Sequence, residues 1–314
     1  MKLKSQLATL LTIFLSCNVF AADKMAKAPA MKPSAAYTAT TDDIRSAVGF
    51  MPTMFKQYPQ EALPAAWEEM KAVQMNPASA VPGKYKELIG LAVAAQIPCK
   101  YCVYFHKKFA MLNGATEREV NEAIAVAGSV RKWSTYVYGS QMDLEAFKKD
   151  VDKLVSSAKA TAQKSTPSPV ATEAANITTA DMAMKDVQNM YGFVPGFISD
   201  YYKPALPGAW KGLRDFHMSQ TTAIPMKYKG LIGLAVGSQM PCTHCVYIDS
   251  EMAKANGATA DELKEAVLMS ATVRNWSTIL NGVAVDENTF RREVDQMVTN
   301  AKRKMNATDR QAAN

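Results

Sequence analysis

The sequence predicts an all-α protein made of two tandem helical-bundle repeats. Three observations support this fold class. The sequence contains an internal repeat at an offset of 143 residues, its apolar residues follow helical spacing, and no segment shows the alternation of apolar and polar residues that is typical of a strand. Residues 82–116 and 225–259 are identical at 21 of 35 positions, and the offset pairs all four tryptophans. Duplication of one helical unit is therefore the expected organisation.

The helices around the best-matched segment can be predicted in order. Apolar residues within 84–96 recur at i, i+3, i+4 and i+7, which favours a helix. Pro98 ends that helix or begins the next one, expected over 99–112, and Asn113-Gly114 closes it with a left-handed cap. Thr116–Glu119 has the pattern of a capping box, which predicts a third helix to about residue 130. Each signal returns 143 residues later.

The N-terminus has the pattern of a secretory signal peptide. Lys2 and Lys4 precede an apolar run from Leu7 to Phe20, whose 14 residues are fewer than the roughly 20 that span a bilayer. Val19-Phe20-Ala21 is a small-x-small cleavage pattern, so we expect cleavage after Ala21 and a periplasmic or secreted protein free of the membrane. The alternative, a lipoprotein anchored at Cys17, has a poor lipobox.

Composition and the repeats together predict the domain boundaries. The segment between the copies is rich in Ala, Ser, Thr and Pro without a large apolar face, which is typical of a linker. The predicted order is a signal peptide (1–21), a flexible tail (22–41), repeat 1 with an intact site (42–155), a linker (156–180), repeat 2 with a degenerate site (181–301) and a flexible tail (302–314).

The overall charge excludes one class of partner. The net charge is +7, but the basic residues are scattered and form no stripe that would neutralise phosphates, so no nucleic-acid partner is expected. Apolar residues make up 48% and charged residues 21% of the chain, an ordinary globular composition. Without Cys17 four cysteines remain as two pairs, in a compartment that permits disulfides.

The first cysteine pair lies in a pattern suited to redox chemistry. Cys99, Cys102 and His106 share one helix face at i, i+3 and i+7, and Glu87 lies one helix back. The helix N-terminus favours a thiolate, to which we expect nearby Lys100 to contribute. A thiolate can attack a peroxide, the other groups can move the proton, and the second thiol can capture the sulfenic acid as a disulfide.

This spacing of Glu, Cys-x-x-Cys and His resembles the signature of AhpD-like alkylhydroperoxidases of the carboxymuconolactone decarboxylase superfamily. The resemblance covers roughly 82–139 and 225–282. It implies an antioxidant, peroxiredoxin-like oxidoreductase in which Cys102 is peroxidatic, Cys99 resolves, and Glu87 and His106 form a proton relay. It also implies a hydroperoxide substrate, an unidentified thiol reductant protein and a homo-oligomer, with a trimer favoured. The decarboxylase branch lacks the cysteine pair.

The second copy departs from this pattern. Cys242 and Cys245 remain, but Gly230 replaces the glutamate and Asp249 replaces the histidine. As a carboxylate, Asp249 would disfavour a thiolate at Cys245. His244 lies between the cysteines, where some AhpD-like proteins also carry histidine, and could support a redox role. We expect a weakened, structural or redirected site.

The first cysteine pair also allows a structural or metal-binding role. It could be an inert disulfide, although so short a loop removes little unfolded-state entropy. Zinc could use Cys99, Cys102 and His106, but no fourth ligand is evident. Haem attachment is excluded because a histidine does not follow directly, so no metal and no cofactor are expected. The alternatives to a peroxidase are a thiol-disulfide oxidoreductase acting on proteins and a non-enzymatic assembly protein of the same fold.

Overall fold

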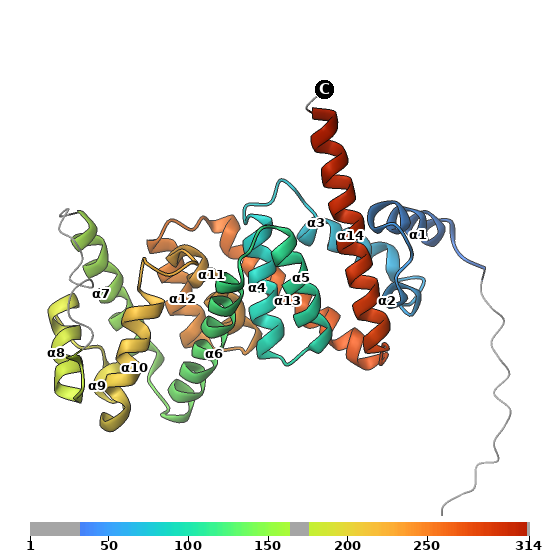
Figure 1. Ribbon diagram of the computed structural model, residues 1–314. Helices are drawn as coiled ribbons and strands as arrows, with labels where there is room; N and C mark the ends of the chain where they lie inside the picture. The colour runs from blue at the N-terminus through green and yellow to red at the C-terminus, as the bar shows by residue number, and fades with distance from the viewer. Residues whose placement is uncertain (1–31, 164–175, 313–314) are drawn as a thin grey trace, which may run out of the picture.

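The computed structural model describes residues 32–163 and 176–312, and throughout these ranges the regular elements are helices (Figure 1). The all-α prediction is confirmed. Repeat 1 contains α1 (Ala35–Val48), α2 (Thr53–Lys56), α3 (Leu63–Gln74), α4 (Gly83–Gln96), α5 (Lys100–Leu112), α6 (Glu117–Gly139) and α7 (Leu144–Gln163). Repeat 2 contains α8 (Ala180–Tyr191), α9 (Gly196–Ser199), η3 (Lys203–Ala205), α10 (Leu206–Gly212), η4 (Leu213–His217), α11 (Met226–Gln239), α12 (Thr243–Ala255), α13 (Ala260–Gly282) and α14 (Glu287–Ala312).

The local signals in the sequence work as expected. Cys99 is the N-cap of α5, and Gly114 after its end adopts φ 83°, a conformation that favours glycine. Thr116 forms both hydrogen bonds of a capping box with Glu119 at the start of α6. This helix continues to Gly139, beyond the predicted end near residue 130, because Val137 is still buried in the core.

Helices extend into segments for which the sequence indicated tails and a linker. The predicted signal peptide (1–21), most of the first tail and residues 164–175 lie outside the described residues. Within the described part, α1 begins at Ala35, α7 runs to Gln163, and α14 runs to Ala312. Tertiary contacts explain the last extension: Lys304 donates to the carbonyls of Ser46 and Ala47 at the end of α1.

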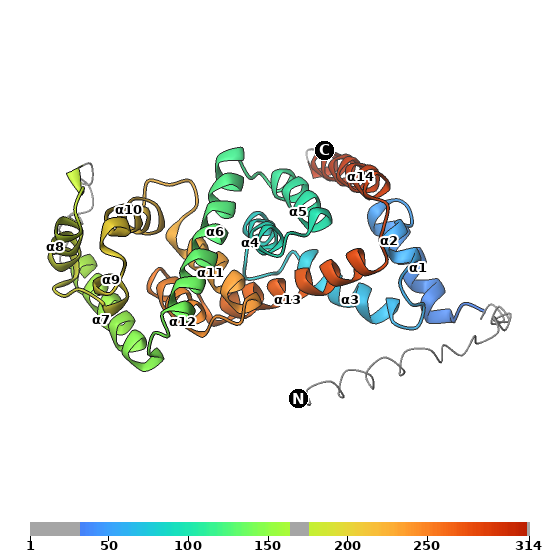
Figure 2. The same ribbon diagram turned by 90° about the horizontal axis from the view of Figure 1, so that it is seen from below.

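The two repeats interlock around a shared hydrophobic core. In the middle of the molecule α4 packs against α11 and α13, and α6 packs against α11. The last helix of each repeat crosses to the other repeat: α14 lies along α5, and α7 lies along α12, at opposite ends of an elongated molecule (Figures 1 and 2). Each helix that begins at a cysteine pair is therefore covered by the last helix of the other repeat.

Equivalent contacts at the repeat boundary show approximate two-fold symmetry. Tyr85 of α4 stacks on Tyr228 of α11, its counterpart in the other repeat, with ring centroids 3.5 Å apart and planes 8° from parallel. Two equivalent residues face each other only across a symmetry axis, so the axis passes between these rings.

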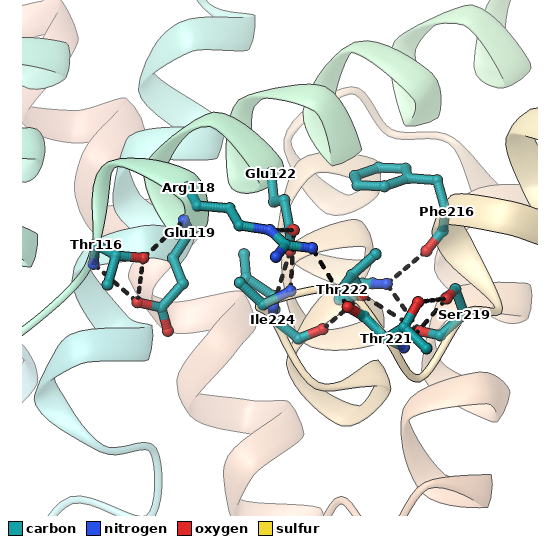
Figure 3. A network of polar contacts seen from close by, with 11 residues as sticks. Thr116, Arg118, Glu119, Glu122, Phe216, Ser219, Thr221, Thr222 and Ile224 are labelled. Atoms are coloured by element: carbon teal, nitrogen blue, oxygen red, sulfur yellow. Dashed lines mark hydrogen bonds and ion pairs between the residues drawn. The ribbon is translucent and has the colours of Figure 1, made fainter.

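Two carboxylates, one buried (Glu122) and one half-buried (Glu265), join the repeats reciprocally. Glu122 of α6 accepts hydrogen bonds from the backbone N–H groups of Ala223 and Ile224, at 2.9 and 2.8 Å, just before α11 (Figure 3). Its counterpart Glu265 of α13 accepts from the N–H groups of Ala80 and Val81, both at 2.8 Å, just before α4. The chain therefore folds as two interdependent halves.

None of the helices within 32–163 and 176–312 is long and apolar enough to cross a membrane.

Candidate functional site

In repeat 1, α4 and α5 bring together the four residues singled out from the sequence. Glu87 and His106 are buried, at 5% and 4% exposure, and Glu87 Oε2 lies 2.7 Å from His106 Nδ1. Gly90 makes this approach possible, because a Cβ atom there would lie 2.6 Å from the same nitrogen. A glycine on α4 thus creates the space for the imidazole.

The hydrogen bond to Glu87 determines the tautomer of His106. A carboxylate oxygen only accepts hydrogen bonds, so Nδ1 carries the proton, and Nε2 of the neutral ring is left as an acceptor. A histidine oriented in this way can take a proton at Nε2 and return it. The pair therefore has the arrangement that a buried acid–base group needs.

The cysteines of repeat 1 form a disulfide, with their Cα atoms 5.3 Å apart. Cys99 is fully buried, and its sulfur accepts a hydrogen bond from the N–H of Cys102 at 3.2 Å. Cys102 and His106 line one small pocket of about 30 Å³, whereas Cys99 does not line it. A small molecule in the pocket can therefore reach Cys102 but not Cys99.

Both repeats form the wall of this pocket. Met54 and Met70 come from α2 and α3 of repeat 1, while Trp276 and Leu280 come from α13 and Phe290 from α14 of repeat 2. The motif helices α4 and α5 alone would leave the site open on one side. The pocket is consequently made by both halves of the chain.

Two details differ from the sequence-based expectations. Lys100 is 77% exposed and lies 4.0 Å from Glu287, so its charge is directed to solvent rather than to Cys102. Asn281 of α13, which no sequence pattern singled out, directs its side-chain amide toward Cys99 Sγ at 4.0 Å. The helix N-terminus and a repeat-2 amide, rather than Lys100, are the polar groups beside the sulfur of Cys99.

In repeat 2, the cysteine geometry is conserved but the relay is not. Cys242 and Cys245 form a disulfide with Cα atoms 5.2 Å apart, and the Cys242 sulfur accepts from the N–H of Cys245. At Gly230, a Cβ atom would lie 2.9 Å from the backbone nitrogen of Ala253. Since α11 and α12 approach so closely here, a glutamate at position 230 would force them apart.

Asp249 occupies the position of the relay histidine but has a different character. It lies over Gly233 of α11 and has no hydrogen bond or ion pair within the described residues. Burial raises its pKa to about 8, so the side chain is mostly protonated at pH 7. The expected repulsion between an Asp249 carboxylate and a Cys245 thiolate therefore does not apply at neutral pH.

The histidines of repeat 2 lie in the wall of a second pocket. His244 is buried, and its Nε2 donates to the carbonyl of Met142 in repeat 1 at 3.1 Å. His217, which the sequence did not mark as functional, has its pKa lowered to about 4 by burial and by the charges of Lys229 and Lys132. His217 is the counterpart of Gln74, which lines the first pocket, and only the tertiary structure shows that both positions face a pocket.

In the part of the chain that the structure describes, no group of three or more His, Cys, Asp or Glu side chains is arranged to hold a metal ion.

Comparison with known proteins matches both repeats to one family. The model of the "Carboxymuconolactone decarboxylase family" matches residues 61–141 and 204–288. A Paracoccus denitrificans protein described as "Uncharacterized protein 4 in cox locus" is 36% identical over 62 residues, which are 20% of this chain and 56% of that protein. A crystal structure of a protein assigned as a γ-carboxymuconolactone decarboxylase subunit from Burkholderia xenovorans matches with 15% identity and a TM-score of 0.46, covering 88% of this chain and 100% of that one.

Proposed function

Because the chain belongs to the carboxymuconolactone decarboxylase family, we propose that repeat 1 is the active site of a thiol-dependent hydroperoxide reductase. The observation that carries this proposal is the buried hydrogen bond between His106 and Glu87, in a site where Cys102 lines a pocket and is close enough to Cys99 to form a disulfide. A merely structural disulfide has no need of a buried acid–base pair beside it.

The first step oxidises Cys102 and reduces the peroxide. His106 takes the proton of the Cys102 thiol, and the thiolate attacks one oxygen of ROOH. The O–O bond breaks, Cys102 becomes a sulfenic acid, and the proton returned by His106 converts the departing alkoxide to ROH. Glu87 holds the ring in place and stabilises its transient positive charge.

The second step protects the oxidised sulfur. The Cys99 thiol attacks the sulfenic acid of Cys102, a disulfide forms, and water leaves. A dithiol reductant must then restore both thiols by exchange, which consumes its two electrons. For an exported protein this donor would be periplasmic or extracellular, and we propose a thiol protein for that role.

The dimensions of the site favour a small substrate over a protein substrate. Cys99 is fully buried, Cys102 is 4% exposed, and the adjoining pocket measures about 30 Å³. A thiol-disulfide oxidoreductase must present a sulfur to the disulfide of another protein. A hydroperoxide can reach Cys102 with much less displacement of the surrounding helices.

Cysteine variants test the proposal directly. Cys102→Ser should abolish nearly all peroxide consumption, whereas Cys99→Ser should leave a sulfenic acid on Cys102 that a dimedone probe traps for mass spectrometry. Cys245→Ser should lower the rate of peroxide consumption only slightly. If Cys245→Ser abolishes consumption while Cys102→Ser spares it, the active repeat has been assigned incorrectly.

If the purified protein instead reduces insulin disulfides without consuming peroxide, the proposed reaction is wrong and the oxidoreductase alternative stands.

A further inference from the structure

The two repeats enclose pockets of very different size at equivalent positions. The pocket of repeat 2 has a volume of about 160 Å³, compared with about 30 Å³ in repeat 1. Smaller side chains in repeat 2 account for part of this difference: Ile248 stands where repeat 1 has Phe105, and Asp249 stands where it has His106. Degeneration of the relay has therefore left a pocket large enough to hold a molecule.

Aromatic rings from both repeats form much of the wall of the large pocket. Trp133 and Phe147 belong to repeat 1, and Phe197 and Trp210 belong to repeat 2. An engineered apolar cavity of about 150 Å³ in another protein binds benzene, so this volume suits a molecule with about one ring. Such a wall recognises an apolar body.

Polar groups without partners are concentrated around this pocket. The Trp133 Nε1, His217 Nε2 and His244 Nδ1 atoms are buried in residues that line it, and none has a hydrogen-bond partner within the described residues. Asp249 also lines the pocket without a partner among those residues. A buried polar group without a partner is unfavourable, so a ligand that forms a hydrogen bond with one of them gains affinity. Asp249 is the best placed to bind a ligand, since it is half-buried and lines the pocket, so its carboxyl group can be reached from there.

The state of charge of the wall restricts the ligand further. At pH 7 Asp249 is mostly protonated and His217 is neutral, because burial shifts their pKa values to about 8 and about 4. Lys229 is 3% exposed, and its ammonium group donates to the carbonyls of Phe216 and Ser219. A charged ligand would thus lose its hydration without gaining a free counter-charge.

We propose that the pocket of repeat 2 binds a compact, uncharged organic molecule with an apolar body of about one ring and one oxygen-containing head group that hydrogen-bonds to Asp249. The neighbouring disulfide of Cys242 and Cys245 lies at the pocket through Cys245. The inference does not depend on peroxide reduction in repeat 1, because binding is measured on the oxidised protein without turnover.

Four probes of matched size test this proposal by calorimetry or ligand-observed NMR at pH 7: benzyl alcohol, toluene, benzylamine and benzoate. Benzyl alcohol should bind best, about fivefold more tightly than toluene, since one additional hydrogen bond contributes about 1 kcal/mol. Benzylamine and benzoate should bind at least tenfold more weakly than benzyl alcohol. Asp249→Leu should remove the preference for benzyl alcohol over toluene.

Ile248→Phe introduces the residue found at the equivalent position of repeat 1. It should fill the pocket and lower the affinity for benzyl alcohol at least tenfold. Met305→Phe, at an exposed position of α14, is the control and should leave the affinity unchanged. Asp249→Asn should retain part of the preference, which keeps the test valid if Asp249→Leu does not fold. The proposal is overturned if no probe binds and the pocket holds only water, if a charged probe binds best, or if Ile248→Phe leaves binding unchanged.

Discussion

The hydrogen bond between His106 and Glu87 leads to a prediction about rate. Glu87→Gln and His106→Ala should each slow peroxide consumption by about 10²-fold or more, because a positioned acid–base group typically contributes 10²–10⁴-fold. Stopped-flow measurement of peroxide loss checks this, with circular dichroism to show that both variants remain helical. Glu117→Gln, at an exposed carboxylate of α6, is the matched control and should react at the normal rate. A normal rate in His106→Ala would remove the relay from the mechanism.

Asp249 leads to a prediction about stability and pH. Its pKa is about 8 in the folded protein and near 3.8 in the unfolded chain, so between these values the folded state binds more protons. The free energy of unfolding should therefore fall as the pH rises from about 4 to 8. Asp249→Asn should remove this dependence. The free energy of unfolding of the variant, relative to that of the natural protein, should therefore rise by about 2 kcal/mol between pH 5 and 8. This change in free energy is roughly half of what the full pKa shift would give between these pH values. It is reduced because solvent reaches the Asp249 side chain, which is only partly covered by protein atoms.

Urea unfolding at the two pH values measures this difference. Asp261→Asn, at a residue whose side chain is 75% exposed, serves as the control and should show no such growth. An Asp249→Asn variant whose advantage is equal at pH 5 and pH 8 would contradict the raised pKa.

The exchange of terminal helices makes α14 part of the first site. Phe290 is 2% exposed, contacts the ring of Tyr101 with centroids 5.2 Å apart, and lines the small pocket. Phe290→Leu should lower the free energy of unfolding by about 1–2 kcal/mol and should change the preference for cumene hydroperoxide over hydrogen peroxide. Phe147→Leu in α7 should cost a similar amount of stability. An unchanged preference in Phe290→Leu would show that α14 does not contact the substrate.

The interlocked core predicts that neither half folds alone as a monomer. Leu88 of α4 and Leu231 of α11 are both fully buried in one cluster, so separating the repeats would expose the surfaces that they share. Fragments 32–163 and 176–312, expressed separately, should be insoluble or should dimerise. Co-expression should restore a soluble complex with a cooperative thermal transition. A fragment that is monomeric, helical and cooperatively folded would disprove this interdependence.

The oligomeric state of the protein remains a prediction. Family resemblance favours a trimer, in which three chains would present six repeats. Light scattering at micromolar concentration should give three times the mass of a single chain, and a monomer mass alone would contradict the prediction.

Local features of this protein were predictable because their causes lie within a few residues. The all-α class, the boundaries of α4 and α5, the capping box at Thr116 and the left-handed Gly114 all follow from spacing, caps and turn residues. The pairing of Glu87 with His106 was also predictable, since one Pro98 turn joins their helices and the face of each helix is set by its periodicity.

Features that depend on distant parts of the chain required the tertiary structure. The sequence determined that the protein is duplicated, helical and equipped with two cysteine pairs, because these properties follow from identity and local spacing. The tertiary structure decided that each site is completed by the other repeat, that burial raises the pKa of Asp249 and that His217 lines a pocket. Burial and desolvation depend on which helices pack together, and these helices are often more than 100 residues apart in the sequence. The hydrogen bond between Thr53 and Glu293 is an example, and no local sequence pattern identifies such partners.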